Sequence, residues 1–228
     1  MGEAVVRRRV NAKFLNLKVA GKGMYRRYFK RLIDVSFSAV AIVFISPVFL
    51  IVAALVKLTS RGPIIFQQER LAKGGDVFKM YKFRSMYLNS EVQGVYSDNK
   101  DPRLTPIGKW IRLFSLDELP QFFNVLKGDM SLIGPRPILT YMPFPIEEYT
   151  EDQLQVLSVR PGMTGWAQVH GRKEVQWADR FELNIWYVHH LSFYLDLKIF
   201  FITIYKVLGM HGNQSVGRTD IKIKADKS

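Results

Sequence analysis

The chain of 228 residues contains no cysteine, which excludes a disulfide framework, a thiolate metal site and a cysteine nucleophile. It is also poor in charge, since charged residues make up 23% of the sequence and hydrophobic residues 48%. This balance is apolar for a soluble domain but too polar for a bundle of transmembrane helices. Length and composition therefore predict one sizeable domain with an appended membrane element.

Several common catalytic motifs are missing as well. The sequence has no P-loop, no Rossmann glycine pattern and no Gly-x-Ser-x-Gly nucleophile elbow. Its four histidines lack the spacing of a zinc site, and His189-His190 beside Tyr187 is better explained by interfacial packing. The chemistry of the protein must therefore come from other residue types.

The positive charge is concentrated at the N-terminus. The net charge is +13, and residues 1–31 contain ten Lys or Arg but a single acid, Glu3. Such an arm can bind nucleic acid or an anionic membrane surface, or it can be a solvated tail. Because a long apolar segment follows directly, the membrane interpretation is favoured.

This apolar segment runs from Val35 to Leu58, and Lys57 is its one charged residue. A bilayer-spanning helix needs about 20 apolar residues, so length alone favours a single spanning anchor. However, Ser46-Pro47 lies in the middle, where proline removes a helical hydrogen bond and bends the axis. Both flanks are also basic, whereas the positive-inside rule predicts an asymmetry. A re-entrant helix that enters and leaves on the same face is therefore an equally supported alternative.

The remaining pattern predicts an α+β fold that is mostly helical with a small β-hairpin. Many Gly and Pro turns lie between residues 128 and 175, which is typical of a site assembled from loops. Segment 179–208 has polar and apolar residues on opposite arcs, which fits an interfacial membrane helix or an ordinary core-facing helix. The other expected elements are strands at 64–66 and 77–81 joined by a Gly74-Gly75 turn, and helices at 107–114 and 117–127.

The acidic pair Asp117-Glu118 is the strongest candidate for chemistry. Adjacent carboxylates can share a divalent cation, or one can attack while the other positions metal and substrate. Alternatively, Ser115 with Glu118 three residues later fits a helix capping box. Arginines in turn-rich segments favour chemistry, because guanidinium groups bind phosphate oxygens in pairs and metal-assisted phosphoryl transfer needs such cations. These arginines are Arg84, Arg103, Arg112, Arg136, Arg160 and Arg172.

An ordered series of motifs extends from about residue 30 to residue 208. It comprises Lys30-Arg31-Leu32-Ile33-Asp34, Ser46-Pro47, Gly62-Pro63-Ile64-Ile65-Phe66-Gln67-Gln68-Glu69-Arg70, Tyr81-Lys82-Phe83-Arg84-Ser85-Met86, Asp101-Pro102-Arg103-Leu104-Thr105-Pro106-Ile107-Gly108, Ser115-Leu116-Asp117-Glu118-Leu119-Pro120-Gln121, Lys127-Gly128-Asp129-Met130-Ser131, Gly134-Pro135-Arg136-Pro137 and Arg160-Pro161-Gly162-Met163-Thr164-Gly165-Trp166-Ala167-Gln168-Val169. The series resembles that of the bacterial monotopic phosphoglycosyl transferases, sugar transferases that start polysaccharide and glycan assembly. The chain resembles their minimal catalytic form.

The resemblance implies a reaction and roles for the acidic pair. Asp117 would attack the sugar-linked phosphate of a UDP-sugar and release UMP, and polyprenyl (undecaprenyl) phosphate would then take the phosphosugar from this aspartyl intermediate. Glu118 would orient the pair, and both carboxylates would hold Mg²⁺. Two other hypotheses compete with this one: a membrane glycosyltransferase that releases UDP, and a non-enzymatic basic membrane scaffold.

The resemblance also implies binding residues. Substrate contacts are expected from Arg112, Arg136, Arg160, Lys82, Arg84, Arg103 and Pro137, and contacts with lipid or carrier phosphate from Lys30 and Arg31. His170 and His190 stand where many relatives have Asn. The identity of the sugar stays open among glucose, galactose, N-acetylated and di-amino deoxy sugars.

The expected organisation follows from the same resemblance. Residues 1–29 form a basic arm, 30–61 a re-entrant membrane helix kinked at Ser46-Pro47, 62–210 a cytoplasmic catalytic domain with interfacial helices, and 211–228 a tail. The protein is expected at the cytoplasmic face of the cytoplasmic membrane. Its expected partners are a UDP-sugar, polyprenyl phosphate and membrane lipid but no nucleic acid, and a homo-oligomer is compatible with the sequence.

Overall fold

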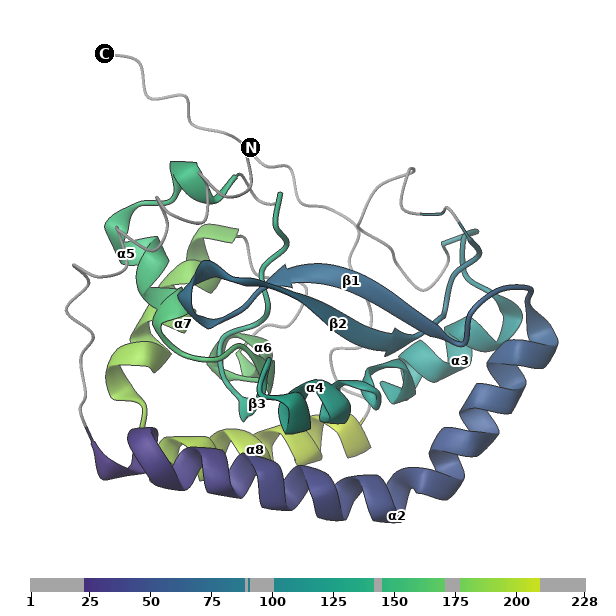
Figure 1. Ribbon diagram of the computed structural model, residues 1–228, viewed down its shortest axis with the longest axis horizontal. Helices are drawn as coiled ribbons and strands as arrows, with labels where there is room; N and C mark the ends of the chain where they lie inside the picture. Colours follow the sequence, from purple (N-terminus) through teal and green to yellow (C-terminus); the bar gives the residue numbers. More distant parts are fainter. Residues whose placement is uncertain (1–22, 89, 91–100, 142–144, 171–176, 210–228) are drawn as a thin grey trace.

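The computed structural model describes residues 23–88, 90, 101–141, 145–170 and 177–209. Most of the expected basic arm, the expected tail and Arg172 lie outside these residues. Figure 1 shows a long helix along one side of the molecule and a twisted hairpin above it. The helices and strands are α2 (Lys30–Thr59), β1 (Ile65–Leu71), β2 (Val77–Phe83), α3 (Pro106–Leu113), α4 (Gln121–Lys127), β3 (Ser131–Ile133), α5 (Glu151–Leu154), β4 (Gly162–Thr164), α6 (Trp166–Val169), α7 (Trp177–His190) and α8 (Phe193–Leu208). Short helical turns are η1 (Tyr25–Phe29), η2 (Lys73–Gly75), η4 (Leu116–Glu118), η5 (Ile146–Glu148) and η6 (Gln155–Ser158). The α+β prediction is confirmed.

The predicted hairpin is confirmed, with longer strands than expected. β1 and β2 pair antiparallel from Ile65 opposite Phe83 to Leu71 opposite Val77. Gly74 adopts a φ of 84° in the connecting turn, where a side chain would be strained. Phe78 and Met80 of β2 face the core, and this face packs on α4 and the residues after it. The buried cluster contains Phe78, Met80, Val125 and Met130.

A second, parallel sheet was not predicted. Ser131 of β3 pairs with Gly162 of β4, and Ile133 pairs with Thr164. The two backbones approach so closely that a Cβ on Gly162 would lie 2.1 Å from the Gly134 nitrogen. Three-residue strands are too short to show a periodic pattern, which explains the omission. This sheet brings the segments after Gly128 and after Arg160 side by side.

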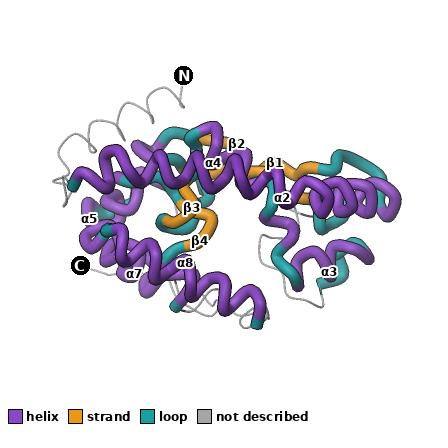
Figure 2. The backbone as a smooth tube through the Cα atoms, turned by 90° about the horizontal axis from the view of Figure 1, so that it is seen from below, coloured by secondary structure: helices purple, strands orange, loops and turns teal. Residues whose placement is uncertain are grey.

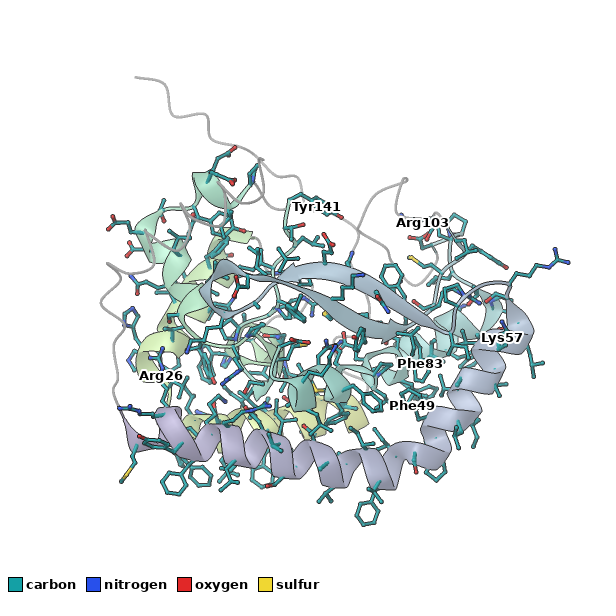
Figure 3. All side chains as sticks on the ribbon, viewed as in Figure 1. Arg26, Phe49, Lys57, Phe83, Arg103 and Tyr141 are labelled. Carbon is teal, nitrogen blue, oxygen red and sulfur yellow. The ribbon has the colours of Figure 1, made fainter. Side chains whose placement is uncertain are left out.

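Helix α2 stays helical through Pro47 but bends sharply (Figure 1). Proline lacks the N–H that would bond the Val43 carbonyl, four residues earlier. The Ser46 hydroxyl donates to this carbonyl instead, with an Oγ–O distance of 2.8 Å. Phe49 lies at the bend (Figure 3), and its ring centroid is 4.6 Å from that of Phe83. The Ser-Pro pair therefore bends the helix and satisfies the carbonyl that the bend releases.

The N-terminal end of α2 is fixed to the body by buried polar contacts. Lys30 Nζ lies 2.6 Å from Asp196 Oδ2 on α8. The Asp34 carboxylate accepts hydrogen bonds from the Ser131 hydroxyl at 2.8 Å and the Leu132 N–H at 3.0 Å. These contacts link α2 to α8 and β3.

The C-terminal end of α2 returns to the same body. Arg84, which follows β2, donates from Nη2 to the carbonyl and hydroxyl of Ser60, each at 2.7 Å, and from Nη1 to the Pro63 carbonyl. The last turns of α2 belong to a buried apolar cluster of Val52, Val56, Phe83 and Ile111. Both ends of α2 therefore contact one folded unit.

Segment 179–208 was expected as one helical segment but forms two helices. Ser192 separates them because its hydroxyl accepts the Leu195 N–H at 3.3 Å and caps α8. On α8 the polar residues face the protein: Asp196 is buried and the Thr203 hydroxyl lies 2.8 Å from that of Thr164. The apolar residues divide between two sides, because Leu195 and Ile199 are buried in the core whereas Phe201 is 60% exposed. The core-facing interpretation therefore holds for one side of this helix, and the interfacial interpretation of the exposed side stays a prediction.

The outward faces of α2 and α8 form an exposed apolar surface, and Figure 2 shows the two helices flanking one side of the molecule. The segment Tyr25–Thr59 is long and apolar enough to cross a membrane, and only 11% of its most apolar window is buried. Large exposed apolar surfaces of this kind mark membrane or partner contact. On α2 they include Val40, Val43, Phe44, Leu50, Ile51 and Leu58, and on α8 Tyr194, Phe201 and Tyr205.

Candidate active site

The acidic pair lies in the helical turn η4, between α3 and α4. Ser115 precedes it with a φ of 57°, the one positive φ among the described non-glycine residues, and its side chain makes no capping bond. The capping-box interpretation is therefore wrong. Backbone strain of this type concentrates at functional sites. Asp117 is buried and Glu118 is half-buried.

Lys82, on β2, is the cation nearest to both acids. Its Nζ lies 2.9 Å from Glu118 Oε1 and 3.9 Å from Asp117 Oδ2. Alternation along β2 places Lys82 on the same face as Phe78 and Met80, at the end of the strand where that face is only partly buried. A half-buried ammonium between two carboxylates offsets part of their mutual repulsion.

The acidic pair lines a cavity of about 420 Å³ between α2 and α8. One part of its wall is cationic, with Lys82, Arg112 of α3 and Arg136 of the loop after β3. Another part is apolar and comes largely from α2 and α8. This part includes Phe37, Phe122, Phe200, Ile204 and Val207. The cavity can therefore accept a molecule with a phosphate group and an apolar portion.

Three of the predicted substrate residues meet at this cavity, and a fourth lies beside it. Lys82, Arg112 and Arg136 line it together with the acidic pair. Pro137 lines a small neighbouring hollow, and its carbonyl accepts a hydrogen bond from Arg70 Nη1 at 2.9 Å.

The structure does not bring Arg84 or Arg103 to the cavity. Arg84 is buried against the end of α2, as described above. Arg103 Nη2 lies 2.6 Å from Asp101 Oδ2, and its hydrogen bonds lower the pKa of Asp101. Both guanidinium groups are engaged with protein atoms, which fits a structural role, and their contact with substrate stays a prediction.

Arg160, Lys30 and Arg31 lie together elsewhere, around a second cavity of about 40 Å³. None of its lining residues lines the larger cavity. Arg31 donates to the Val125 and Leu126 carbonyls at the end of α4, at 2.6 and 3.0 Å. Arg160 donates from Nε to the Gly128 carbonyl at 3.0 Å. Phosphate binding by these three residues stays a prediction.

The acidic pair fits a magnesium ion by its donor set. Mg²⁺ is usually bound by one or two carboxylates together with substrate phosphates and water. Asp117 and Glu118 supply two adjacent carboxylates at a cavity that has room for a diphosphate. Within the described part of the chain, no group of three or more His, Asp or Glu could hold a metal ion. Substrate phosphates and water would be the further ligands of such a metal.

His170 and His190 do not line the cavity but terminate an aromatic stack between α6 and α7. The ring centroid of His170 lies 3.7 Å from that of Trp166, and His190 lies 4.2 Å from Trp186. The two tryptophan rings are stacked at 4.7 Å. These histidines therefore have a packing role in this structure, as was inferred for the His189-His190 pair.

One site residue was missed from the sequence. Gln168 of α6 lines the larger cavity and is 7% exposed, yet its amide has no hydrogen-bond partner among the described residues. Buried amides are almost always paired, so an unpaired one at a cavity wall suits a ligand contact. A single glutamine in a turn-rich segment gives no such signal in the sequence.

The family of the chain agrees with this site. A family model described as bacterial sugar transferase matches residues 25–210, and the chain belongs to this family. It is 44% identical to the uncharacterized sugar transferase EpsL of Bacillus subtilis over 81% of this chain and 90% of that protein.

Longer relatives carry more specific names. A UDP-N-acetylgalactosamine-undecaprenyl-phosphate N-acetylgalactosaminephosphotransferase of Aeromonas hydrophila is 43% identical over 79% of this chain. The UDP-glucose:undecaprenyl-phosphate glucose-1-phosphate transferase of Escherichia coli K12 is 40% identical over 79% of this chain. The chain spans 44% and 40% of the length of these two relatives.

Proposed function

We propose that this protein moves a sugar 1-phosphate from a UDP-sugar to polyprenyl phosphate as the first membrane step of polysaccharide or glycan assembly. The names of the longer relatives describe transfers of this kind. The observation that carries the proposal is the cavity, where a buried aspartate lies together with cationic residues and with apolar residues of α2 and α8. A nucleotide sugar matches the cationic part, and a polyprenyl chain matches the apolar part.

In the first half-reaction, an oxygen of the Asp117 carboxylate attacks the phosphorus that carries the sugar. A new O–P bond forms while the P–O bond to UMP breaks, and UMP leaves with the electron pair. A carboxylate forms a mixed anhydride, which is energetic enough to pass the phosphosugar on. Arg112 and Arg136 bind the diphosphate oxygens and offset their charge as the carboxylate approaches.

In the second half-reaction, a phosphate oxygen of polyprenyl phosphate attacks the same phosphorus. The bond to Asp117 breaks, and the carboxylate is restored. The bond between the sugar and its phosphate never breaks, so the anomeric configuration is retained. The acceptor reaches the site between α2 and α8, since both helices supply apolar residues to the cavity and to the exposed face.

Glu118 and Lys82 organise the nucleophile. Glu118 orients the pair, and the Lys82 ammonium reduces the electrostatic repulsion between the two carboxylates before substrate binds. Asp117 and Glu118 would hold Mg²⁺, which would neutralise part of the charge on the diphosphate.

We further propose that α2 is re-entrant and that the protein is monotopic at the cytoplasmic face. A straight helix of 30 residues is about 45 Å long and would hold its ends on opposite sides of a bilayer. The bend at Ser46-Pro47 and the attachment of both ends to one folded unit support a helix that returns to the side it came from.

The mechanism is tested by incubating purified protein with Mg²⁺ and a UDP-sugar labelled in the sugar, without acceptor. We expect release of UMP and a labelled covalent adduct that polyprenyl phosphate discharges. Asp117→Asn should lose the adduct and at least about 10³-fold in rate. Glu118→Gln, the matched control, should slow the reaction while Asp117 still forms the adduct.

Three outcomes contradict the proposal. Release of UDP in place of UMP indicates the competing glycosyltransferase reaction. Sugar attachment that requires acceptor excludes the two-step route. Full activity of Asp117→Asn removes Asp117 from the chemistry.

A further inference from the structure

The second cavity, at the N-terminal end of α2, concentrates positive charge away from the acidic pair. It lies among η1, α2, η2, β3 and η6 and has a volume of about 40 Å³. Its five cations come from segments far apart in the sequence: Arg26, Lys30, Arg31, Lys73 and Arg160. The fold has therefore gathered these cations at one place.

The acids at this cavity do not balance the cations. Asp34 lines the cavity, but its carboxylate accepts hydrogen bonds from Ser131 and Leu132 of β3. Asp196 neutralises Lys30 at 2.6 Å and also accepts the Tyr25 and Tyr187 hydroxyls. Two carboxylates thus face five cations, and a local excess of positive charge remains. Burial and the neighbouring Arg160 and Arg26 lower the pKa of Lys73, which reflects this excess.

The cavity lies beside aromatic side chains that suit the headgroup region of a membrane. Tyr28 and Phe29 of η1 are exposed, as are Phe193 and Tyr194 at the start of α8. The Tyr25 ring packs edge-to-face on Phe193 at 5.6 Å and ties the two helix starts together. Aromatic side chains collect at the headgroup level of bilayers, so the neighbouring cations are placed to meet lipid phosphates.

We propose that this basic cavity binds the phosphate of an anionic phospholipid headgroup, at a site separate from the Asp117 cavity. Guanidinium groups bind phosphate oxygens in pairs, and a half-buried site strengthens each contact relative to water. Carrier-lipid phosphate and free phosphate share this chemistry, but the adjoining aromatic and apolar surface favours a lipid.

Occupancy of this site would support the active site through two contacts. Arg31 holds the end of α4, the helix that follows the acidic pair. Asp34 holds the start of β3, and Leu132 and Ile133 of that strand line the larger cavity. A bound phosphate would steady the end of α2 from which both contacts arise.

The test measures the unfolding temperature of the full chain in neutral detergent during titration with short-chain phosphatidylglycerol. Phosphatidylcholine of equal chain length and inorganic phosphate are the comparison ligands. We expect phosphatidylglycerol to raise the unfolding temperature in proportion to occupancy, and the other two to have little effect. Arg26→Gln and Lys73→Gln should each weaken the apparent affinity about 5- to 10-fold.

Arg27→Gln is the matched control. Arg27 is adjacent to Arg26 and carries the same charge, but it is exposed, lies over the Tyr28 ring and does not line the cavity. It should bind phosphatidylglycerol like the unaltered chain. Equal losses in Arg27→Gln and Lys73→Gln would reveal a diffuse charge effect and overturn the proposal, as would unaltered binding in both cavity variants.

The comparison ligands decide the source of the phosphate. An equal response to inorganic phosphate would overturn the lipid assignment. If phosphatidylglycerol has no effect but a polyprenyl phosphate analogue stabilises the chain, and Arg26→Gln and Lys73→Gln lose that stabilisation, the site belongs to the carrier and the proposal is also overturned. None of these readouts uses catalysis, so they stand whether or not the proposed reaction is correct.

Discussion

Replacing Arg84 with methionine separates a structural arginine from a substrate-binding one. The guanidinium donates to the Ser60 and Pro63 carbonyls at the end of α2 and is almost fully buried. Methionine has a similar length but donates no hydrogen bond, so both carbonyls lose a charged donor. Each loss costs about 1–3 kcal/mol, which gives a destabilisation of about 2–6 kcal/mol. For a chain of this size, each kcal/mol lowers Tm by about 2–4 °C.

The measurement is thermal unfolding in nanodiscs, paired with KM for the UDP-sugar at a temperature where the variant stays folded. Arg84→Met should lower Tm by at least about 4 °C and leave KM unchanged. Arg112→Met, the control at the cavity, should raise KM or lower kcat with little change in Tm. A raised KM with an unaltered Tm in Arg84→Met would refute the structural assignment.

Four further predictions concern the membrane helix and the cavity. The chain has no native cysteine, so cysteines introduced at Tyr28 and Arg61 can be labelled with an impermeant maleimide, and both should react from the cytoplasmic face only. A cysteine introduced at Phe44 should be protected by the membrane. Labelling of the first two positions from opposite faces would indicate a spanning helix. Ser46→Ala should cost about 1–2 kcal/mol in thermal unfolding, because it leaves a bend carbonyl unpaired in lipid; an unaltered Tm would show that the hydroxyl is dispensable. Gln168→Met should keep or raise Tm, because it removes an unpaired buried amide, and should lower kcat/KM for the UDP-sugar about 10-fold. A lower Tm with full activity would show that the residue has a structural role only. EDTA should abolish UMP release and Mg²⁺ should restore it, whereas activity in excess EDTA would exclude the metal.

Local elements of the fold were predictable because their signals are local. The Gly74-Gly75 turn between two β-rich runs is sufficient for the hairpin, and it forms as expected. The bend in α2 follows from proline chemistry at Ser46-Pro47. The β3–β4 sheet and the break at Ser192 were not predicted, because each depends on a close approach between distant segments or on a single cap.

The sequence predicted which residue types form the site, but not which of the arginines lie at it. An arginine near a Gly or Pro turn can bind a phosphate or the carbonyls at a helix end, and the two alternatives look the same in sequence. The structure places Arg112 and Arg136 at the acidic pair, Arg84 at the end of α2 and Arg160 at the second cavity. Proximity, not residue type, separates these roles.

The sequence by itself determined that the chain has a bent apolar helix with basic flanks, a hairpin and an acidic pair among arginines in the order of a known family. Only the tertiary structure decided that Ser115 is not a cap and that α8 leaves part of its apolar surface exposed. It also decided that Lys82 lies between Asp117 and Glu118. The physical reason is that residue type and periodicity determine which contacts a side chain is able to make. Long-range packing, such as Lys30 on Asp196, determines which of those contacts it makes in the folded chain.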